Sequence, residues 1–428
     1  MLLPLFLSST GICTDTRKPL PGGIFFALSG PNFNANAFAA QALENGCAYA
    51  VIDDPEVAVD ERYVLVPDVL KALQELAREH RRSMDIPVIG ITGTNGKTTT
   101  KELLHAVLMA DRPTLATEGN LNNHIGVPLT LLKLKPEHRI AFIEMGASKR
   151  GDIAELCAIA EPTHGLITNI GKAHLEGFGN LEGVIATKTE LYTWLREHDG
   201  TVFVNGDDPL LMEKSAGLTR VMYGGEEGMN TRGNAVESEE PCMELVFDDK
   251  GKTGHYHIVT RLIGNYNAPN ALAAVCLGQH FTVPDAVIAG ALSDYEPSNN
   301  RSQFKDTGKN QLVLDAYNAN PTSMAAALAN FARLHSGRKK LAILGDMREL
   351  GESSAAEHAA IIRHVQALGL DALFVGLEFM QAATGQQLRV FPAVAEAIKA
   401  LQADPPTDQL ILVKGSRGVK LEEVVEVL

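Results

Sequence analysis

The stretch from Ile86 to Lys101 has the residue types and spacing of a phosphate-binding turn. Its sequence, IPVIGITGTNGKTTTK, reads as a buried strand, a glycine-rich turn and a helix start. Gly93 and Gly96 let backbone N–H groups turn inward, Lys97 can reach the β- and γ-phosphates, and Thr98 can offer a hydroxyl to Mg²⁺. We call residues 93–99 the phosphate loop. Its members are Gly93, Thr94, Asn95, Gly96, Lys97, Thr98 and Thr99.

The spacing of the phosphate loop is shorter than the common GxxxxGK[ST] pattern. Ile91 stands five positions before Gly96, and the nearer glycine is Gly93. This argues against the common GTPases and kinases. A Gly/Thr-rich turn without a ligand is the alternative, but the joint presence of strand, turn, Lys-Thr pair and amphipathic helix favours a nucleotide site.

Three further residues could serve a metal. Glu144 ends an apolar run, and a buried carboxylate is costly unless it meets a cation, which Mg²⁺ beside Thr98 would supply. A structural Lys or Arg could instead pair with it. His174 lies in a loop of small and polar residues, and Lys188 lies in a helical pattern. Taken alone, His174 is more typical of an ordinary histidine than of a metal ligand, and Lys188 is more typical of a helical lysine that faces water.

Polar residues near the last domain boundary could contact a nucleotide. Asn267 and Asn270 open an Ala-rich helix; one Asn can be an N-cap, and the other, one turn on, could bind an adenine edge. Arg301 could lean over phosphates or lie at the surface. Asp315 ends a strand and could accept hydrogen bonds from ribose hydroxyls. Asn318 and Asn320, in the segment DAYNANP, would otherwise be ordinary turn residues before a helix.

The elements that must position these residues predict three α/β units. The chain has 428 residues, too many for one ordinary core, and composition shifts suggest boundaries at 1–84, 85–297 and 298–428. In the middle unit, strands alternate with helices, which predicts a mostly parallel sheet covered on both faces with ligands beyond the carboxyl ends of its strands. Residues 221–263 indicate an antiparallel insertion or edge.

The third unit shows four apolar runs typical of strands, at 311–314, 341–344, 372–375 and 410–413. Asp315, Asp346 and Lys414 follow three of these runs. We therefore expect the three to converge on one edge of a second parallel sheet, where a second substrate or the far side of a nucleotide would bind.

Composition and charge exclude several classes of partner. The net charge of −14 leaves no basic excess for nucleic acid or an anionic membrane. No apolar run is long enough for a membrane span, and the apolar start has no basic region typical of a signal peptide. Five scattered cysteines without CxxC spacing indicate neither disulfides nor zinc. We expect a cytoplasmic protein without membrane insertion.

Several segments together resemble the ATP-dependent Mur ligases. Thr92–Thr99 is shared with folylpolyglutamate synthetases, whereas other segments look like the branch that adds D-alanyl-D-alanine to a UDP-N-acetylmuramoyl tripeptide. These narrower segments are Gly119–Thr130, Glu144–Ala147, Tyr317–Pro321, Leu344–Gly351 and Lys414–Arg417. The resemblance runs from about Asp15 to Arg417.

The resemblance implies three α/β domains in a bacterial cytoplasmic enzyme, with a monomer expected. It implies an N-terminal domain for the uridine nucleotide, a central P-loop ATPase domain with a parallel sheet, and a C-terminal Rossmann-like domain beside the ATP ribose and D-Ala-D-Ala.

The resemblance also implies a role for each candidate residue. ATP contacts fall on the phosphate loop, Asn267, Asn270, Arg301 and Asp315. Two Mg²⁺ ions fall on Thr98, Glu144, His174 and a carbamylated Lys188, and the catalytic set is Lys97, Lys188, His174 and Arg301. Substrate contacts fall on Asp15, Thr16, Arg17, Asn120, Asn122, Asn123, Asn318 and Asn320.

Two rival functions share the phosphate loop. A folylpolyglutamate synthetase or another amino-acid-adding ligase has the same domain plan, but the Asn120 segment and Tyr317–Pro321 weigh against it. A non-catalytic nucleotide-binding regulator would need the loop without Glu144, His174, Arg301 and Asp315. No residue indicates whether the third residue of the tripeptide is meso-diaminopimelate or lysine.

Overall fold

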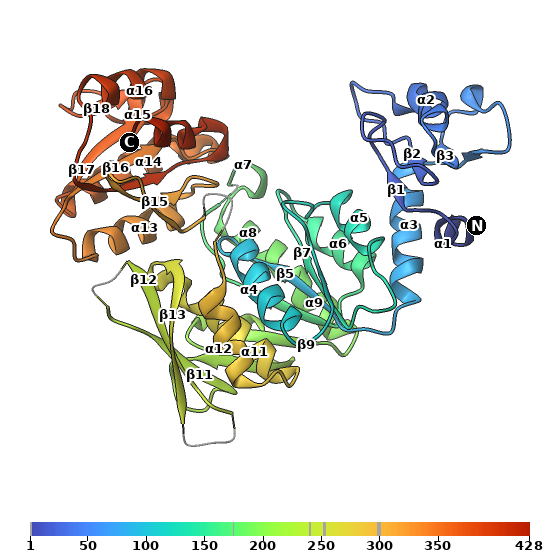
Figure 1. The fold of residues 1–428 in the computed structure, drawn as a ribbon, viewed down its shortest axis with the longest axis horizontal. Helices are drawn as coiled ribbons and strands as arrows, with labels where there is room; N and C mark the ends of the chain where they lie inside the picture. The colour runs from blue at the N-terminus through green and yellow to red at the C-terminus, as the bar shows by residue number, and fades with distance from the viewer. Residues whose placement is uncertain (1, 174, 239–240, 251–253, 298–300) are drawn as a thin grey trace.

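The computed structural model describes residues 2–173, 175–238, 241–250, 254–297 and 301–428. These residues form three sheets of four, nine and six strands, which follow one another along the chain (Figure 1). The three-domain α/β architecture expected from the sequence is confirmed. None of the helices in the described part of the chain is long and apolar enough to cross a membrane.

The first sheet is parallel throughout, in the order β1-β2-β3-β4. Its strands are β1 (Ile12–Cys13), β2 (Ile24–Phe26), β3 (Tyr49–Ile52) and β4 (Tyr63–Leu65). The helices of this region are α1 (Leu2–Leu7), η1 (Ala35–Phe38), α2 (Ala39–Glu44), η2 (Pro55–Val57) and α3 (Val69–Arg82). Helix α3 leads from this sheet down to the next one (Figure 1).

Helix α3 connects the first sheet to the second along the chain and also packs against the second sheet's helices. It begins at Asp68, whose carboxylate accepts a hydrogen bond from the Lys71 backbone N–H at 2.9 Å. Its apolar stripe, which includes Leu73 and Leu76, shares a hydrophobic cluster with Leu131 and Leu156 of the second sheet's helices. The boundary expected near residue 84 therefore follows a helix that packs against the central domain.

The second sheet holds the phosphate loop and has the strand order β13-β12-β11-β10-β9-β8-β5-β7-β6. Its strands are β5 (Val88–Thr92), β6 (Thr114–Ala116), β7 (Ile140–Glu144), β8 (His164–Ile167), β9 (Thr201–Asn205), β10 (Thr219–Gly224), β11 (Thr231–Val236), β12 (Cys242–Asp248) and β13 (His255–Ile263). Its helices are α4 (Lys97–Met109), α5 (Gly126–Leu131), α6 (Asp152–Ala160), α7 (Leu175–Phe178), α8 (Leu181–Lys188), α9 (Glu190–Glu197), α10 (Pro209–Lys214), η3 (Asn265–Asn267), α11 (Ala268–His280) and α12 (Asp285–Asp294).

Helices cover both faces of the second sheet, as the alternation of strands and helices predicts. Ile89 and Ile91 of β5 pack into the cluster formed with α4, α11 and α12, whereas Val88 packs into the cluster on the opposite face. This alternation follows from the two-residue period of a strand. Strand β5 is fully buried and lies between the parallel strands β8 and β7, and the turn that follows it lies at the carboxyl edge of these strands.

The antiparallel edge expected over residues 221–263 is confirmed for its last strands and wrong for its first. Strands β11, β12 and β13 pair antiparallel, but β10 pairs parallel with both β9 and β11. Val221 lies opposite Phe203 in that parallel register. Strand β10 therefore extends the parallel core, and only the hairpin strands beyond it reverse direction.

A pH-dependent contribution to stability is expected from His164 at the start of β8. Its ring stacks on Phe203 with a centroid distance of 5.9 Å, beside His280 and Phe281. Burial and the neighbouring His280 lower the pKa of His164 to about 4. The folded state thus favours the neutral ring, so its contribution is present above the unfolded pKa of about 6.5 and is lost as the pH falls toward 4. Urea unfolding between pH 7 and pH 4 should show a steeper loss for the natural chain than for His164→Phe.

The third sheet is parallel except for its first strand, in the order β14-β15-β19-β16-β17-β18. Its strands are β14 (Gln303–Asp306), β15 (Gln311–Asp315), β16 (Lys339–Gly345), β17 (Asp371–Val375), β18 (Arg389–Phe391) and β19 (Gln409–Lys414). Its helices are α13 (Pro321–Arg333), η4 (Gly351–Ser353), α14 (Ser354–Ala367), α15 (Leu377–Ala382), α16 (Val394–Ala403), η5 (Arg417–Val419) and η6 (Leu421–Val427).

The four predicted strands of the third sheet are confirmed as β15, β16, β17 and β19, and their polar ends gather at one edge as expected. Lys414 Nζ donates to a carboxylate oxygen of Asp315. Asp346, however, accepts hydrogen bonds from the backbone N–H groups of Glu378 and Phe379 at the start of α15. Asp346 thus anchors a helix instead of lining the large cavity at this edge.

Candidate active site

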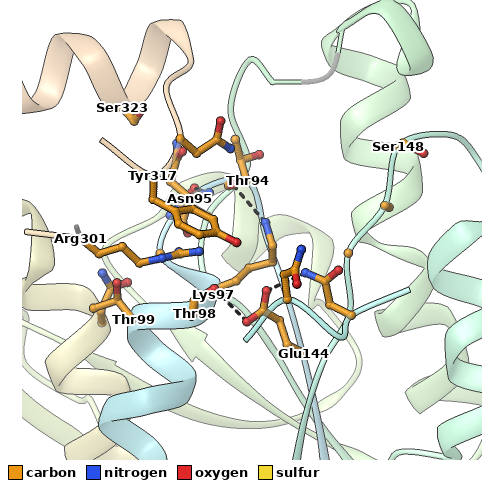
Figure 2. Close-up of a pocket in the computed structure, with 18 of the residues that line it drawn as sticks. Thr94, Asn95, Lys97, Thr98, Thr99, Glu144, Ser148, Arg301, Tyr317 and Ser323 are labelled. Carbon is orange, nitrogen blue, oxygen red and sulfur yellow. Dashed lines mark hydrogen bonds between the residues drawn. The ribbon is translucent and has the colours of Figure 1, made fainter. Parts of the chain in front are cut away.

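A cavity of about 1000 Å³ opens where the second and third sheets meet (Figure 2). Its lining comes from the phosphate loop, the ends of β7 and β8, the start of α11 and the turn after β15. The polar residues that line it are Thr94, Asn95, Lys97, Thr98, Thr99, Asn120, Asn122, Asn123, His124, Glu144, Ser148, Lys149, Asp152, Glu155, Asn169, Tyr266, Asn267, Asn270, Arg301, Ser302, Asp315, Tyr317, Asn318, Thr322, Ser323 and Lys414.

The phosphate loop is held open by glycine backbone conformations and by one asparagine. Gly93 and Gly96 have φ of +143° and +79°, values that side chains disfavour. Asn169 brackets the loop, because its carbonyl accepts from Thr94 N–H at 2.9 Å and its Oδ1 accepts from Asn95 N–H at 3.0 Å. Helix α4 begins directly after Gly96. The loop therefore presents a helix N-terminus to the cavity, which favours an anion.

Substitution of Gly93 by alanine should disrupt this loop. A Cβ atom there would lie 2.0 Å from Thr168 Oγ1, on a backbone conformation that alanine avoids. Strain of this kind costs about 1 to 3 kcal/mol, so Gly93→Ala should unfold at lower temperature and lose nucleotide binding. The matched control is Gly290→Ala on α12, where a Cβ meets no atom within 4 Å. Equal melting temperatures for the two variants would contradict the prediction.

Lys97 lies folded over the phosphate loop. Its Nζ donates to the carbonyl oxygens of Gly93 at 2.7 Å and Thr94 at 3.2 Å (Figure 2). Loss of water around the ammonium lowers its pKa, Glu144 opposes this, and the cationic Arg301 adds to the lowering. The side chain thus stands as a close positive charge at the position that phosphates would approach.

The Thr98 hydroxyl and the Glu144 carboxylate meet next to the loop. Thr98 Oγ1 donates to Glu144 Oε2 at 2.9 Å, and Asn122 Nδ2 donates to Glu144 Oε1 at 2.8 Å (Figure 2). Glu144 is 1% exposed, and no Lys or Arg within the described ranges forms an ion pair with it. A buried carboxylate beside a hydroxyl is an oxygen donor set that suits Mg²⁺. The described residues thus do not form the structural ion pair that was the alternative for Glu144.

The remaining expected metal residues differ in where they lie. His174 lies outside the described residues. Within the described ranges, no three His, Cys, Asp or Glu side chains cluster as a metal site. Lys188, at the end of α8, does not face water as a typical helical lysine does: it is 2% exposed, with Nζ 5.7 Å from the centre of the Phe178 ring. Burial and the nearby Lys97 hold its pKa well below the ordinary value, against the pull of Asp152, Glu190 and Glu144.

Asn267 and Asn270 form a hydrogen-bonded chain that reaches the phosphate-loop helix. Thr100 Oγ1 donates to Asn270 Oδ1 at 3.1 Å, and Asn270 Nδ2 donates to Asn267 Oδ1 at 3.0 Å. Asn267 occupies the N-cap position of α11 but makes no capping hydrogen bond, and its amide donates to the carbonyl of Ile263 instead. The N-cap interpretation of this side chain is therefore wrong, and both asparagines border the cavity.

The C-terminal domain contributes an ion pair and a stacked arginine. Asp315 and the 1%-exposed Lys414 pair at the edge where β15 and β19 lie side by side. The Arg301 guanidinium lies over the Tyr317 ring, with Cζ 3.7 Å from the ring centre (Figure 2). Arg301 thus lines the cavity. The alternative, an arginine at the surface that faces bulk solvent, is wrong.

The asparagines expected at the substrates make different contacts. Asn120, Asn122, Asn123 and Asn318 line the cavity. The Asn123 oxygen also accepts from the Ile125 and Gly126 N–H groups at the start of α5. Asn320 is 4% exposed and is not part of the lining; it caps α13 together with Ser323 and donates to Asn95 Oδ1 at 2.7 Å.

Asp15, Thr16 and Arg17 follow β1 in the N-terminal domain and are not part of the cavity lining. The Arg17 side chain is 88% exposed and forms a two-point hydrogen bond with Asp15. That contact lowers the pKa of Asp15 to about 2. The exposed Arg17 and the half-buried Asp15 are the charged groups that this segment offers to a polar ligand.

Sequence reasoning missed two groups of lining residues. Asn169 holds the phosphate loop, and its position at the end of a predicted strand is the signal that could have identified it. Ser148, Lys149 and Asp152 line the cavity from the loop after β7 and the start of α6. Polar residues of these common types show no distinguishing sequence pattern, so their place in the cavity becomes visible only in the fold.

Comparison with known proteins agrees with this arrangement. The family model of the Mur ligase middle domain matches residues 91–278, and that of the Mur ligase glutamate ligase domain matches residues 300–417. A UDP-N-acetylmuramoyl-tripeptide--D-alanyl-D-alanine ligase from Bacillus subtilis is 35% identical over 427 residues, which cover 97% of this chain and 92% of that protein.

Solved structures show the same likeness across all three sheets. A crystal structure of MurF from Acinetobacter baumannii has a TM-score of 0.87 and 31% identity and covers 99% of this chain and 97% of that one. MurF from Thermotoga maritima, solved in complex with ADP, has a TM-score of 0.86 and 27% identity, with coverage of 99% and 97%. A folylpolyglutamate synthase from Mycobacterium tuberculosis shares only the fold, with a TM-score of 0.64 at 17% identity, covering 84% of this chain and 94% of that one. The likeness extends through every domain of the chain, which belongs to the Mur ligase family.

Proposed function

We propose that this protein is an ATP-dependent amide-bond ligase that joins D-alanyl-D-alanine to a UDP-N-acetylmuramoyl tripeptide. The products are the UDP-muramoyl pentapeptide, ADP and phosphate. The observation that carries the proposal is the cavity itself, where a phosphate loop and the Thr98–Glu144 pair face Arg301 and Asp315 across a domain junction. The family membership makes an amide ligase the natural interpretation of that cavity.

ATP would lie between the phosphate loop and the turn after β15. Gly93 and Gly96 are required for the shape of the loop, because a Cβ at either position would collide with Thr168 or Asn270. The N-terminus of α4 and Lys97 would hold the phosphates, Asn267 and Asn270 the adenine side, and Asp315 the ribose. Asp315 is tied to Lys414, so its carboxylate is already oriented toward this edge.

Mg²⁺ would be held by Thr98 and Glu144, with His174 and Lys188 as the further ligands that the family resemblance implies. The metal would supply Lewis-acid stabilisation of phosphate charge. Lys188 would act as a carbamate, which turns the amine into an oxygen ligand. Its burial and lowered pKa favour the uncharged amine, the form able to react with carbon dioxide.

The chain's own residues would act mainly by position and charge. The tripeptide carboxylate attacks the γ-phosphorus of ATP, which gives an acyl phosphate and ADP. The amine of D-Ala-D-Ala then attacks the acyl carbon, so phosphate leaves and the amide forms with release of a proton. Lys97 and Arg301 would stabilise the charge that gathers on the transferring phosphoryl group. No protein nucleophile is needed.

The substrates would approach the cavity from opposite sides. The N-terminal domain, with Asp15, Thr16 and Arg17, would hold the uridine nucleotide, and Asn120, Asn122 and Asn123 would contact the muramoyl tripeptide. Asn318 would lie on the dipeptide side. Asn320 would act there only indirectly, because it is buried against Asn95. We propose domains at 1–84, 85–297 and 298–428 and a cytoplasmic monomer as the working unit.

Phosphate release measured with two substrate sets tests the proposal. The expected result is release that requires ATP, UDP-N-acetylmuramoyl tripeptide and D-Ala-D-Ala together. Release with folate and glutamate instead would identify the folylpolyglutamate activity. Nucleotide binding without release under either condition would indicate a regulator. Parallel reactions with diaminopimelate- and lysine-containing tripeptides would assign the third residue.

A further inference from the structure

Arg301 faces the nucleotide side of the cavity with little polar support. Its Nε is buried and has no hydrogen-bond partner within the described ranges. A guanidinium offers five N–H donors in one plane, and hydrogen bonds at Nε commonly fix the direction of that plane. Another contact must therefore orient this side chain.

We propose that Tyr317 is a positioning residue that orients Arg301 toward the phosphates. The Arg301 Cζ atom lies 3.7 Å from the centre of the Tyr317 ring, well within the range of a cation–π contact (Figure 2). The Arg417 Cζ atom lies 5.4 Å from the same ring centre, so two cations lie near this ring. Both Arg301 and Tyr317 line the cavity. The proposal rests on the proposed function, in which Arg301 meets phosphate.

The segment that carries Tyr317 is anchored on both domains. Asn320, three residues on, donates to Asn95 Oδ1 of the phosphate loop at 2.7 Å. Lys414 Nζ and Ser416 Oγ donate to the carbonyl oxygens of Asn318 and Ala319, each at 3.4 Å. The Tyr317 ring is therefore held by the C-terminal domain while the segment touches the loop that would bind phosphate.

The position of Arg301 matters because Arg301 and Lys97 line the same cavity. The two cations would thus share one anion, and their mutual repulsion would favour its binding. Without the ring, the Arg301 side chain would be mobile in the free protein. Phosphate binding would then have to order it, and this entropy cost would weaken the affinity for phosphate. Removal of the ring should therefore weaken the binding of phosphate groups and leave the binding of the nucleoside unchanged.

Calorimetric binding of a methylene-bridged ATP analogue and of adenosine tests the proposal without turnover. Tyr317→Leu should weaken binding of the analogue about five- to thirtyfold. This change corresponds to about 1 to 2 kcal/mol, the scale of a partly desolvated cation–π contact. Tyr317→Phe keeps the ring and should bind within about twofold of the natural chain. Adenosine should bind all three alike.

A double-mutant cycle shows whether the effect passes through Arg301. In an Arg301→Gln background, Tyr317→Leu should weaken analogue binding no further. Tyr256→Leu is the matched control, because Tyr256 is also half-buried and stacked, on Phe247, but is not part of the cavity lining. Thermal unfolding of each variant checks that it is folded.

Equal weakening by the Phe and Leu variants would overturn the proposal, and so would additive losses in the cycle. Equal loss of adenosine binding would also contradict it, since the ring would then serve the nucleoside. Failure of the proposed function would look different. In that case the binding cycle would still hold, but the natural chain would release no phosphate with the tripeptide and D-Ala-D-Ala.

Discussion

Replacement of Lys97 by alanine is expected to lower turnover by roughly two or more orders of magnitude, the scale for losing one preorganised charge partner. Lys97 Nζ already lies over the loop carbonyls of Gly93 and Thr94, so its charge needs little rearrangement to meet a phosphoryl group. The measurement is steady-state phosphate release with saturating ATP, tripeptide and D-Ala-D-Ala.

Two companion variants separate charge from fold in this experiment. Lys97→Met keeps the apolar stem and should be impaired as severely as Lys97→Ala, since the ammonium is what acts. Lys214→Ala, on helix α10, removes a lysine that pairs with Glu213 at the surface and should leave turnover unchanged. Near-normal turnover of Lys97→Ala would contradict the assignment of the phosphate loop.

Replacement of Lys188 by alanine is expected to lower turnover at least about tenfold to a hundredfold, the range for residues that hold or orient a metal ligand. Lys188 is 2% exposed and forms no ion pair among the described residues, and a buried ammonium is costly unless it is paired or loses its charge. Added bicarbonate should not restore the variant. Short carboxylates such as acetate should restore it in part, because they can occupy the space of the lost carbamate.

The outcome for Lys188 is interpretable because the natural chain supplies its own comparison. After removal of dissolved carbon dioxide, its activity should fall and then return with bicarbonate, while Lys188→Ala should respond only to the carboxylate. Lys188→Gln tests whether length and polarity suffice without a negative charge, and it should resemble the alanine variant. Full activity of Lys188→Ala would show that this lysine only fills space.

Local patterns were sufficient for the elements that hold the site. The turn at 93–99 followed from two glycines, a Lys-Thr pair and the flanking apolar and amphipathic runs, and the structure has the strand, turn and helix there. The parallel strands of the third sheet followed from apolar runs ended by polar residues. These features depend on residues close in sequence, so their signals are present before any fold is known.

Contacts between distant segments were not visible in the same way. Asn320 is expected on the dipeptide side, and no local pattern predicts that its amide donates to Asn95, 225 residues earlier. The sequence offers an N-cap as the alternative to a nucleotide contact for Asn267, but its amide donates to Ile263 and Ser302. Asn320 keeps its local capping hydrogen bond and adds a distant partner, whereas Asn267 makes no capping bond at all.

Residue types and spacing alone were enough to predict the phosphate loop, the α/β class and the side chains that could bind nucleotide and metal. The burial of Lys188, the contact of Thr98 with Glu144 and the stacking of Arg301 on Tyr317 became visible only in the folded chain. Burial, pKa and stacking depend on which segments pack together and exclude water, and local patterns do not contain that information. That is settled when the three sheets pack, and the phosphate loop then gains its partners from the C-terminal domain.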